Sequence, residues 1–288
     1  MVARGRMTIC ARILERFNLL RPLNNWAQSK TSLRGVSRVR SGHSLYRKRG
    51  FVWVSSPKQM STNSERCDSC LYMEAGIILS ASEIHVGDAI NAIKGGKVIA
   101  VPTDTLYGFA CDACSMEAVH RIYDIKGRKH TTPLAICVGD VPDIARFAIV
   151  DHLPHRLLNS LLPGPVTIVL NRGDSSILEK SLNPGLDSIG VRVPDSEFIQ
   201  AIARGSRSAL ALTSANLSGQ PSSVCITDFE CLWQHCAYVY DGGVLPAGRA
   251  GSTVVDLTKP GTFKILRPGS AREETTSILK RFNLDEAP

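Results

Sequence analysis

Two pairs of polar side chains, far apart in the sequence, carry groups suited to binding a phosphorylated substrate. Lys126 and Arg128 are separated by one residue, and so are Ser214 and Asn216, which close an apolar run. Because side chains alternate between the two faces of an extended chain, this spacing places both members of a pair on one face where the backbone is extended. Ammonium and guanidinium groups neutralise phosphoryl oxygens, while hydroxyl and amide groups orient a small polar substrate. The four residues therefore predict a nucleotide-using enzyme.

The basic pair also has a simpler interpretation. Lys126 and Arg128 stand at the exit of a predicted helix, where positive side chains are favoured by the helix dipole and usually face water. Taken alone, the pair would be assigned to the surface. The interpretation of Lys126 and Arg128 as ligands depends on the other polar groups that stand at predicted strand ends.

Several more polar residues stand at such ends. Thr103 and Thr105 follow the strand predicted over residues 97–101, and the carboxyl ends of strands in α/β sheets commonly hold ligands. Both are predicted substrate ligands, with an ordinary turn whose hydroxyls bond the local backbone as the alternative. Ser252 and Arg267 repeat the layout beside later strands.

Arg192 lies between Val191 and Val193 in a predicted strand. An arginine there is either an exposed edge residue or a buried cation that requires an anionic partner. A substrate carboxylate or phosphate is one such partner, so Arg192 is a predicted substrate ligand.

The surrounding pattern predicts one mixed α/β domain. Helices are expected from Ser82 to Gly95-Gly96, from Ser115 to Gly127 with Met116 facing inward, over residues 154–162, after a cap at Asp195, and from Ser270 with Glu273 completing a capping box. Strands are expected over residues 97–101, 134–138, 166–170, 189–193, 209–213, 238–240, 253–257 and 263–266. Successive strands without helices between them argue against a simple doubly wound sheet.

Charge divides the chain into two parts. Residues 1–58 hold 13 of the 34 Lys and Arg residues and one acid, Glu15, whereas the remainder holds 21 basic and 25 acidic residues. An Arg-rich, Ser-rich and acid-poor front is typical of an organellar transit peptide, with a basic arm that contacts RNA as the alternative. We expect residues 1–73 to be a largely disordered leader to mitochondria or another organelle, and residues 74–288 to be the catalytic domain. Initiation at Met60 or Met73 would give a cytoplasmic product.

Composition and cysteine spacing disfavour a membrane-spanning protein and a zinc-ribbon protein. No stretch approaches the roughly 18 apolar residues of a membrane span, so no transmembrane segment is predicted. The nine cysteines include two Cys-x-x-Cys pairs, at 67–70 and 111–114, which superficially resemble a zinc ribbon. The first pair lies at the edge of the presumed leader, and small residues would serve equally at the second, so free thiols are favoured.

No Walker A loop or dinucleotide-binding glycine turn is present, so a nucleotide must bind by another arrangement.

Seven motifs in chain order carry a family resemblance. They are Pro102-Thr103-Asp104-Thr105-Leu106-Tyr107-Gly108, Lys126-Gly127-Arg128, Pro163-Gly164-Pro165-Val166-Thr167, Gly190-Val191-Arg192-Val193-Pro194, Thr213-Ser214-Ala215-Asn216, Ser252-Thr253-Val254-Val255-Asp256 and Arg267-Pro268-Gly269. Together they resemble the YrdC-like L-threonylcarbamoyladenylate synthases over nearly the whole body of the chain. The resemblance implies a twisted mixed β-sheet with flanking helices and a concave substrate cavity.

The resemblance also implies an activity. L-Threonine, bicarbonate or CO2, and ATP with Mg²⁺ as cofactor would give threonylcarbamoyl-AMP and diphosphate, a nucleotidyltransferase reaction. The product would pass to a partner, the tRNA threonylcarbamoyl-transferase complex, for formation of threonylcarbamoyladenosine; a weak direct contact with tRNA is left open. The implied catalytic residues are Lys126, Arg128, Ser214 and Asn216, with Thr103, Thr105, Arg192 and Ser252 at threonine, and Lys126, Arg128, Thr167, Asn216 and Arg267 at ATP. No metal ligand from the protein is predicted.

One departure and one alternative qualify this interpretation. Some members of the family carry a histidine shortly after the Lys-x-Arg element, whereas this chain has the apolar strand 133–137 there, and what replaces that contact is open. A non-catalytic RNA-binding module of the same fold is the alternative. The mildly acidic body and the aromatic content of 6% disfavour it.

Overall fold

The computed structural model describes residues 76–127, 133–173, 176–246 and 248–288. The predicted leader, both alternative start methionines, the first Cys-x-x-Cys pair and Arg128 lie outside the described residues. The boundary predicted between leader and domain at residues 73 and 74 therefore stays a prediction.

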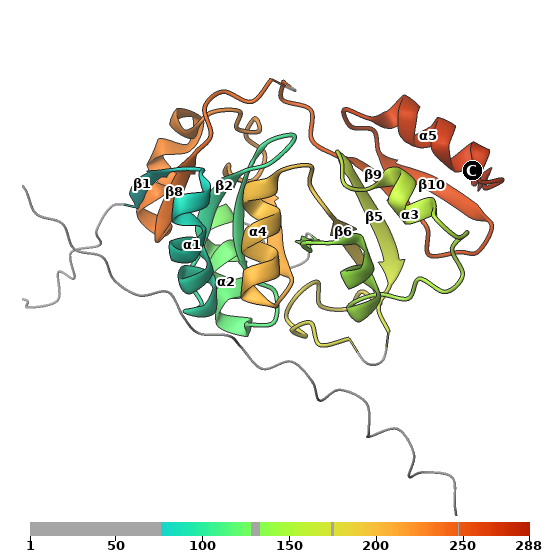
Figure 1. Cartoon of the computed structure of the whole chain (residues 1–288), viewed down its shortest axis with the longest axis horizontal. Coiled ribbons are helices and arrows are strands. Elements are labelled where there is room, and N and C mark those ends of the chain that lie inside the picture. Colours follow the sequence, from blue (N-terminus) through green and yellow to red (C-terminus); the bar gives the residue numbers. More distant parts are fainter. Residues whose placement is uncertain (1–75, 128–132, 174–175, 247) are drawn as a thin grey trace, which may run out of the picture. The chain divides into compact units, whose positions relative to one another are not determined.

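The described residues form a mixed sheet with the strand order β1-β8-β2-β3-β7-β4-β6-β5-β9-β10-β11 (Figure 1). The strands are β1 (Ile77–Ser80), β2 (Ile99–Pro102), β3 (Tyr107–Asp112), β4 (Ala135–Cys137), β5 (Val166–Asn171), β6 (Ser188–Arg192), β7 (Leu210–Ser214), β8 (Tyr238–Asp241), β9 (Thr253–Asp256), β10 (Thr262–Arg267) and β11 (Asp285–Glu286). The sheet contains parallel pairs such as β2–β8 and antiparallel pairs such as β2–β3 and β3–β7. The predicted mixed α/β sheet is confirmed.

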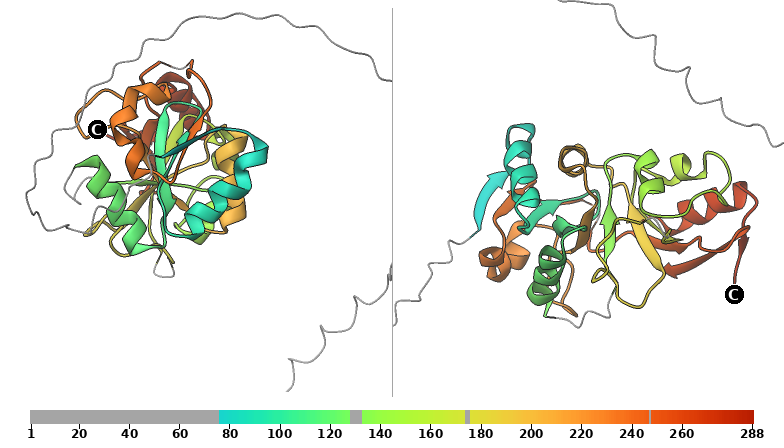
Figure 2. Two further views of the ribbon diagram at one scale, coloured as in Figure 1. Left: turned by 90° about the vertical axis from the view of Figure 1, so that its left-hand side faces the viewer. Right: turned by 90° about the horizontal axis from the view of Figure 1, so that it is seen from below.

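Helices cover both faces of this sheet. They are α1 (Val86–Lys94), α2 (Met116–Lys126), α3 (Leu157–Leu161), α4 (Glu197–Ser206) and α5 (Arg272–Arg281), with short 3-10 helices η1 (Glu83–His85), η2 (Val141–Arg146) and η3 (Ile226–His235). Figure 2 shows α2 on one side of the sheet and α1 with α4 on the other. Strand β3 contributes side chains to the core on both faces of the sheet. Phe109 packs with the α2 side chains, and Ala110 packs with those of α1 and α4. None of the helices described here is long and apolar enough to span a bilayer.

Helix α2 begins and ends where the sequence predicts. The Ser115 hydroxyl accepts a hydrogen bond from the backbone N–H of Ala118 at 3.4 Å, and Gly127 ends the helix in the left-handed region with φ 58°. Glycine adopts that conformation without a Cβ clash. Lys126 is therefore the last helical residue.

Four details of the predicted helices are wrong. Ser82 precedes the 3-10 helix η1 without a side-chain cap, and α1 itself has His85 as its N-cap residue. Met116 is 55% exposed, because Ala118 and Val119 begin the buried stripe and two residues turn the helix by about 200°. Ser196, not Asp195, is the N-cap residue of α4. Helix α5 has Ala271 as its N-cap residue with no side-chain cap, so the predicted capping box is absent there. The Ala271 N–H is instead bonded to the Thr253 hydroxyl at 3.2 Å, which ties the start of α5 to β9.

A buried asparagine fixes the start of β4. Asn183, in the left-handed region with φ 57°, accepts a hydrogen bond from the Leu134 N–H at 2.6 Å and donates one to the Leu134 carbonyl at 2.8 Å. The Tyr123 hydroxyl of α2 also donates to its side-chain oxygen at 3.4 Å. One amide thus joins α2 to the segment that enters β4.

We expect Asn183→Ala to lower the free energy of unfolding by about 3 kcal/mol, because the buried Leu134 N–H and carbonyl lose their partners. Chemical denaturation of the purified chain measures this. Asn283→Ala is the matched control: Asn283 is also left-handed, with φ 59°, but exposed. It should cost less than about 1 kcal/mol. Equal losses in the two variants would show that the clamp contributes nothing beyond backbone conformation.

Candidate functional site

The predicted polar groups at Lys126, Ser214 and Asn216 form one hydrogen-bonded cluster. The Lys126 ammonium donates to the Ser214 carbonyl at 2.6 Å, to the Asn216 side-chain oxygen at 2.8 Å and to the Ser214 hydroxyl at 3.4 Å. The Ser214 hydroxyl donates to the same Asn216 oxygen at 2.6 Å. Lys126 is 2% exposed. The interpretation of Lys126 as a water-facing helix-end cation is therefore wrong.

The backbone reason given for the basic pair is also wrong. Lys126 is helical and Gly127 is left-handed, so this segment is not an extended strand that aligns residues 126 and 128 on one face. What turns Lys126 inward is its place on the buried stripe of α2, with Ile122 and Tyr123. Arg128 lies outside the described residues, and its role stays a prediction.

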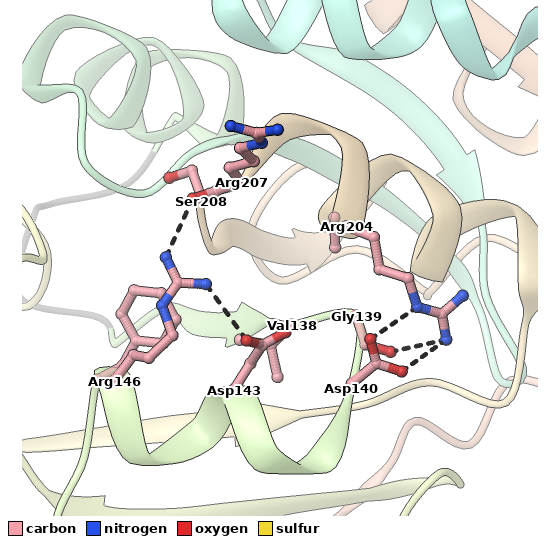
Figure 3. Close-up of a pocket in the computed structure, with 10 residues that line it drawn as sticks. Val138, Gly139, Asp140, Asp143, Arg146, Arg204, Arg207 and Ser208 are labelled. Atoms are coloured by element: carbon pink, nitrogen blue, oxygen red, sulfur yellow. Dashed lines mark hydrogen bonds and ion pairs between the residues drawn. The ribbon is translucent and has the colours of Figure 1, made fainter. Parts of the chain in front are cut away.

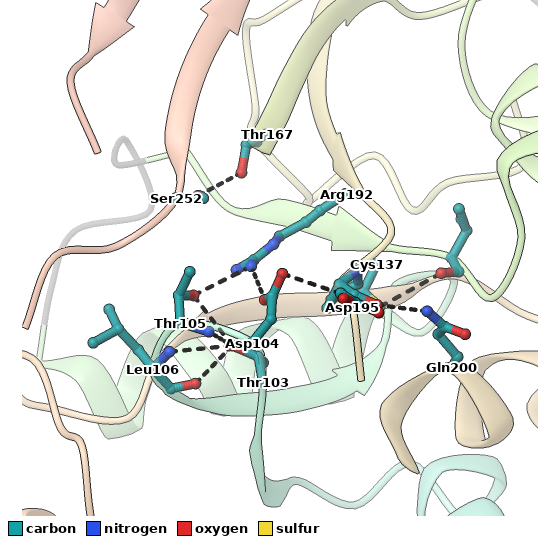
Figure 4. A network of polar contacts seen from close by, with 12 residues as sticks. Thr103, Asp104, Thr105, Leu106, Cys137, Thr167, Arg192, Asp195, Gln200 and Ser252 are labelled. Carbon is teal, nitrogen blue, oxygen red and sulfur yellow. Dashed lines mark hydrogen bonds and ion pairs between the residues drawn. The ribbon is translucent and has the colours of Figure 1, made fainter. Parts of the chain in front are cut away.

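Arg192, the last residue of β6, is a buried cation with an anionic partner inside the chain. It is 7% exposed, and its Nη2 donates to the Asp104 carboxylate and, at 3.2 Å, to the Thr105 hydroxyl (Figure 4). The second Asp104 oxygen accepts from the Asp195 N–H at 3.1 Å. Sequence reasoning missed Asp104, although it offered a signal: a buried arginine requires a carboxylate, and Asp104 is the acid in the loop that holds both predicted threonines.

The hydroxyls of that loop, residues 103–106, differ in what they bond. The Thr103 hydroxyl donates to the Leu106 carbonyl at 2.8 Å and accepts from the N–H groups of Thr105 and Leu106, each at 3.2 Å. The alternative of a turn with local hydrogen bonds thus describes Thr103. The Thr105 hydroxyl faces the Arg192 guanidinium. The roles of Thr103 and Thr105 toward a substrate stay predictions.

Thr167, Ser252 and Arg267 form a third group. The Thr167 and Ser252 hydroxyls are 2.7 Å apart, and Arg267 Nη2 donates to the Ser252 carbonyl at 3.0 Å and to its hydroxyl at 3.3 Å. Burial, and then repulsion from Arg192, lower the pKa of the Arg267 guanidinium below its usual value. Two guanidinium groups therefore lie close enough to repel each other, and an anion between them would relieve that repulsion.

The loop 103–106 is the common neighbour of these groups. Asp104 and Thr105 contact Arg192, and a Cβ placed on Gly251 would lie 3.4 Å from both Leu106 Cδ1 and Arg267 Nη2. The next residue, Tyr107, accepts a backbone hydrogen bond at 2.8 Å from Ala215, which lies between Ser214 and Asn216. The chain thus gathers every predicted site residue that is described around one loop. The predicted concave cavity at this place stays a prediction.

A separate cavity of about 480 Å³ lies between η2 and the C-terminal end of α4 (Figure 3). It contains none of the predicted site residues. Arg204 is paired with Asp140 through two contacts of 2.8 Å, and Arg146 donates to Asp143 at 3.3 Å and to the Arg207 carbonyl at 3.1 Å. These contacts tie α4 to η2, and Arg204 lowers the pKa of the Asp140 carboxyl. We assign two of the three arginines here to structure.

The cysteines and acidic residues offer no metal site in the described part of the chain, where no group of three or more His, Cys, Asp or Glu side chains is placed to hold an ion. Cys111 and Cys114 are free thiols. Burial raises the pKa of the Cys137 thiol in β4 to about 12, so this residue stays protonated near neutral pH.

Comparison with known proteins agrees with the resemblance carried by the motifs. The Sua5/YciO/YrdC family model, described as telomere recombination, matches residues 91–269. Threonylcarbamoyl-AMP synthase of Bos taurus is 48% identical over 201 residues, which are 68% of this chain and 72% of that protein. The Homo sapiens protein of the same name is 48% identical over 198 residues, 67% of this chain and 70% of its own.

A solved structure agrees with the sheet described above. The crystal structure of P. abyssi Sua5 complexed with L-threonine superposes with a TM-score of 0.65 at 29% identity. The match covers 74% of this chain and 62% of that one. Fold, motifs and sequence similarity agree, and the chain belongs to the Sua5/YciO/YrdC family.

Proposed function

We propose that this chain is a threonylcarbamoyl-AMP synthase, which converts L-threonine, bicarbonate or CO2, and ATP into threonylcarbamoyl-AMP and diphosphate. The observation that carries the proposal is the 48% identity, over two thirds of the chain, to mammalian proteins of that name. The gathering of buried cations and hydroxyls around the loop 103–106 supports it. The class of the reaction is nucleotidyl transfer.

The chemistry requires alignment and charge neutralisation more than a strong protein base. The threonine ammonium first gives up one proton to solvent, the neutral nitrogen then attacks CO2, and the adduct gives up a second proton to solvent to become a carbamate. A carbamate oxygen then attacks the α-phosphorus of ATP, and the bond to the diphosphate leaving group breaks. Negative charge accumulates on phosphoryl oxygens in that step, and preorganised cations stabilise it.

One whole group and part of another are assigned to ATP. Lys126 is the buried cation that we place at the phosphates, with Arg128 as its predicted companion and with Ser214 and Asn216 holding the ammonium in position. Thr167 and Arg267 are assigned to the nucleotide as well. Mg²⁺ supplies further charge neutralisation when bound, and we propose that it arrives with ATP and is held by its phosphates.

Arg192, Thr105 and Ser252 are assigned to threonine, with Thr103 shaping the loop that carries Thr105. Arg192 Nε is buried, and no hydrogen-bond acceptor contacts it in the described part of the chain. A donor in this state favours the arrival of an acceptor, because a buried unpaired N–H costs free energy. The carboxylate of an amino acid provides such acceptors.

We further propose that the adenylate passes to a tRNA threonylcarbamoyl-transferase complex for formation of threonylcarbamoyladenosine. The alternative is a non-catalytic RNA-binding module of the same fold, which would need a basic surface rich in aromatic residues. The body after residue 58 carries 21 basic and 25 acidic residues, so the sequence does not favour this alternative. A weak contact with tRNA remains part of the proposal only as a secondary property.

Purified protein incubated with ATP, Mg²⁺, L-threonine and labelled bicarbonate should release diphosphate only when threonine is present, and should form a labelled adenylate. Omission of threonine, and chelation of Mg²⁺, are the controls, and each should remove both signals. A well-folded protein that binds RNA but forms no adenylate would replace this proposal with the RNA-binding alternative.

Lys126→Met should lower threonine-dependent adenylate formation by at least about a hundredfold, because a preorganised charge at the phosphates is lost while side-chain length is kept. Lys94→Met is the matched control, since Lys94 also ends a helix before a glycine but is exposed. It should retain full activity. Asn216→Ala should behave like Lys126→Met. Full activity of Lys126→Met in a folded protein would remove Lys126 from the catalytic group.

We propose that residues 1–73 direct the chain to mitochondria or another organelle, and that a product starting at Met60 or Met73 stays in the cytoplasm. A fluorescent protein fused after residue 73 should enter the organelle. Replacement of Arg12 and Arg16 by Glu should prevent this, because organellar transit peptides are basic and poor in acids. Uniform distribution of the unaltered fusion would contradict the assignment.

A further inference from the structure

The buried Arg192 guanidinium has no free two-point edge. Its Nη2 already donates to two acceptors, the Asp104 carboxylate and the Thr105 hydroxyl. A guanidinium offers a carboxylate two such edges, Nη1 with Nη2 and Nε with Nη2, and both include Nη2. A substrate carboxylate can therefore bind at two points only if one of the present acceptors leaves.

Asp104 is the acceptor that must leave. Its side chain is 9% exposed and that of Arg192 is 8% exposed, so a second carboxylate beside Asp104 would meet strong repulsion in a site with little water. The Thr105 hydroxyl is neutral and can remain. Arg192 Nε, which is buried without an acceptor, completes the edge that the incoming carboxylate would occupy.

A displaced Asp104 would itself be a buried charge without its cation. Only the Asp195 N–H, at 3.1 Å from its second oxygen, would still bond it among the contacts described here. Breaking a buried ion pair by removing one partner is costly, because the other charge stays buried and uncompensated. The ligand that avoids this cost is one that brings a cation together with its carboxylate.

We propose that Asp104 is a specificity-determining residue, and that a free α-amino acid binds by exchange of ion pairs. The substrate carboxylate takes the Nε–Nη2 edge of Arg192, and the Asp104 carboxylate accepts hydrogen bonds from the substrate amino group. Before and after binding, each buried charge has an opposite partner. This inference rests on the proposed function and adds to it how the amino group is recognised.

The proposal predicts discrimination between two ligands that share a carboxylate and a hydroxyl. (R)-3-Hydroxybutyrate is L-threonine without its amino group. Isothermal titration calorimetry with the wild-type chain should find L-threonine bound more tightly by roughly tenfold to a hundredfold, the size expected for a charge-assisted hydrogen bond. Equal affinity of the wild-type chain for the two ligands would overturn the proposal.

Asp104→Asn should change the two affinities in opposite directions. L-Threonine loses the anionic partner of its amino group and binds more weakly, whereas (R)-3-hydroxybutyrate no longer competes with a carboxylate for Arg192 and binds more tightly. The preference should fall to within about threefold. Asp140→Asn is the control, since Asp140 pairs with Arg204 beside the separate cavity, and it should keep the wild-type preference.

A purely structural role for Asp104 gives a different pattern. If Asp104 only positions Arg192, both ligands weaken in parallel in Asp104→Asn, and the proposal is wrong. Threonine-dependent diphosphate release by the wild-type chain tests the proposed function separately. Turnover together with parallel weakening would keep the function and reject the exchange, whereas no binding and no turnover in the wild-type chain would reject both.

Discussion

The buried ion pair between Asp104 and Arg192 is the interaction on which the rest of the site depends. In the sheet order, β7 and β4 lie between β3 and β6, so the loop 103–106 after β2 reaches past two strands to meet the end of β6. Both charges are nearly inaccessible to water, and neither is stable there without the other. The pair therefore holds the loop against β6, and the loop in turn carries Thr105 to Arg192 and Leu106 to Gly251.

The same pair explains how a mildly acidic body keeps a region that suits anions. Burial, and then the charge of Arg192, lower the pKa of the Arg267 guanidinium, and the Asp104 carboxylate neutralises part of the positive charge without removing it. Such local fields depend on which charges are buried together rather than on the net charge of the chain. The basic front of the sequence is not needed for this effect.

The sequence predicted the fold well where a local signal has one common structural meaning, such as a helix cap, a glycine that ends a helix or an apolar run. Ser115 and Gly127 mark the two ends of α2. The apolar run at 166–170 differs from β5 by one residue at its end, and the run at 209–213 differs from β7 by one residue at each end. Strand β3, with the sequence YGFACD, was not predicted as a strand. It is buried on both faces, so its sequence does not alternate between apolar and polar residues, and it also lacks the Val, Ile and Thr residues that mark a strand.

In the candidate site too, local signals identified some residues, while a contact between distant segments could not be predicted. Residue types and their order identified the cations and hydroxyls, because each stands beside a recognisable strand or helix end. The Asp104–Arg192 contact spans 88 positions and depends on two loops meeting, which no local pattern contains. Asp104 was therefore visible only as a member of a motif, without a role.

An ion pair in the resting state has an energetic advantage for an enzyme that binds a zwitterion. A buried guanidinium kept ready for a carboxylate would, without Asp104, destabilise the ligand-free protein or draw in other anions. With Asp104 in place, the ligand-free state is stable, and a carboxylate alone must displace a bound competitor. A ligand with both charges replaces one buried pair by two and leaves no charge uncompensated. Stability of the empty site and selectivity for free amino acids then follow from one contact, which is why Asp104 and Arg192 belong together in any account of this site.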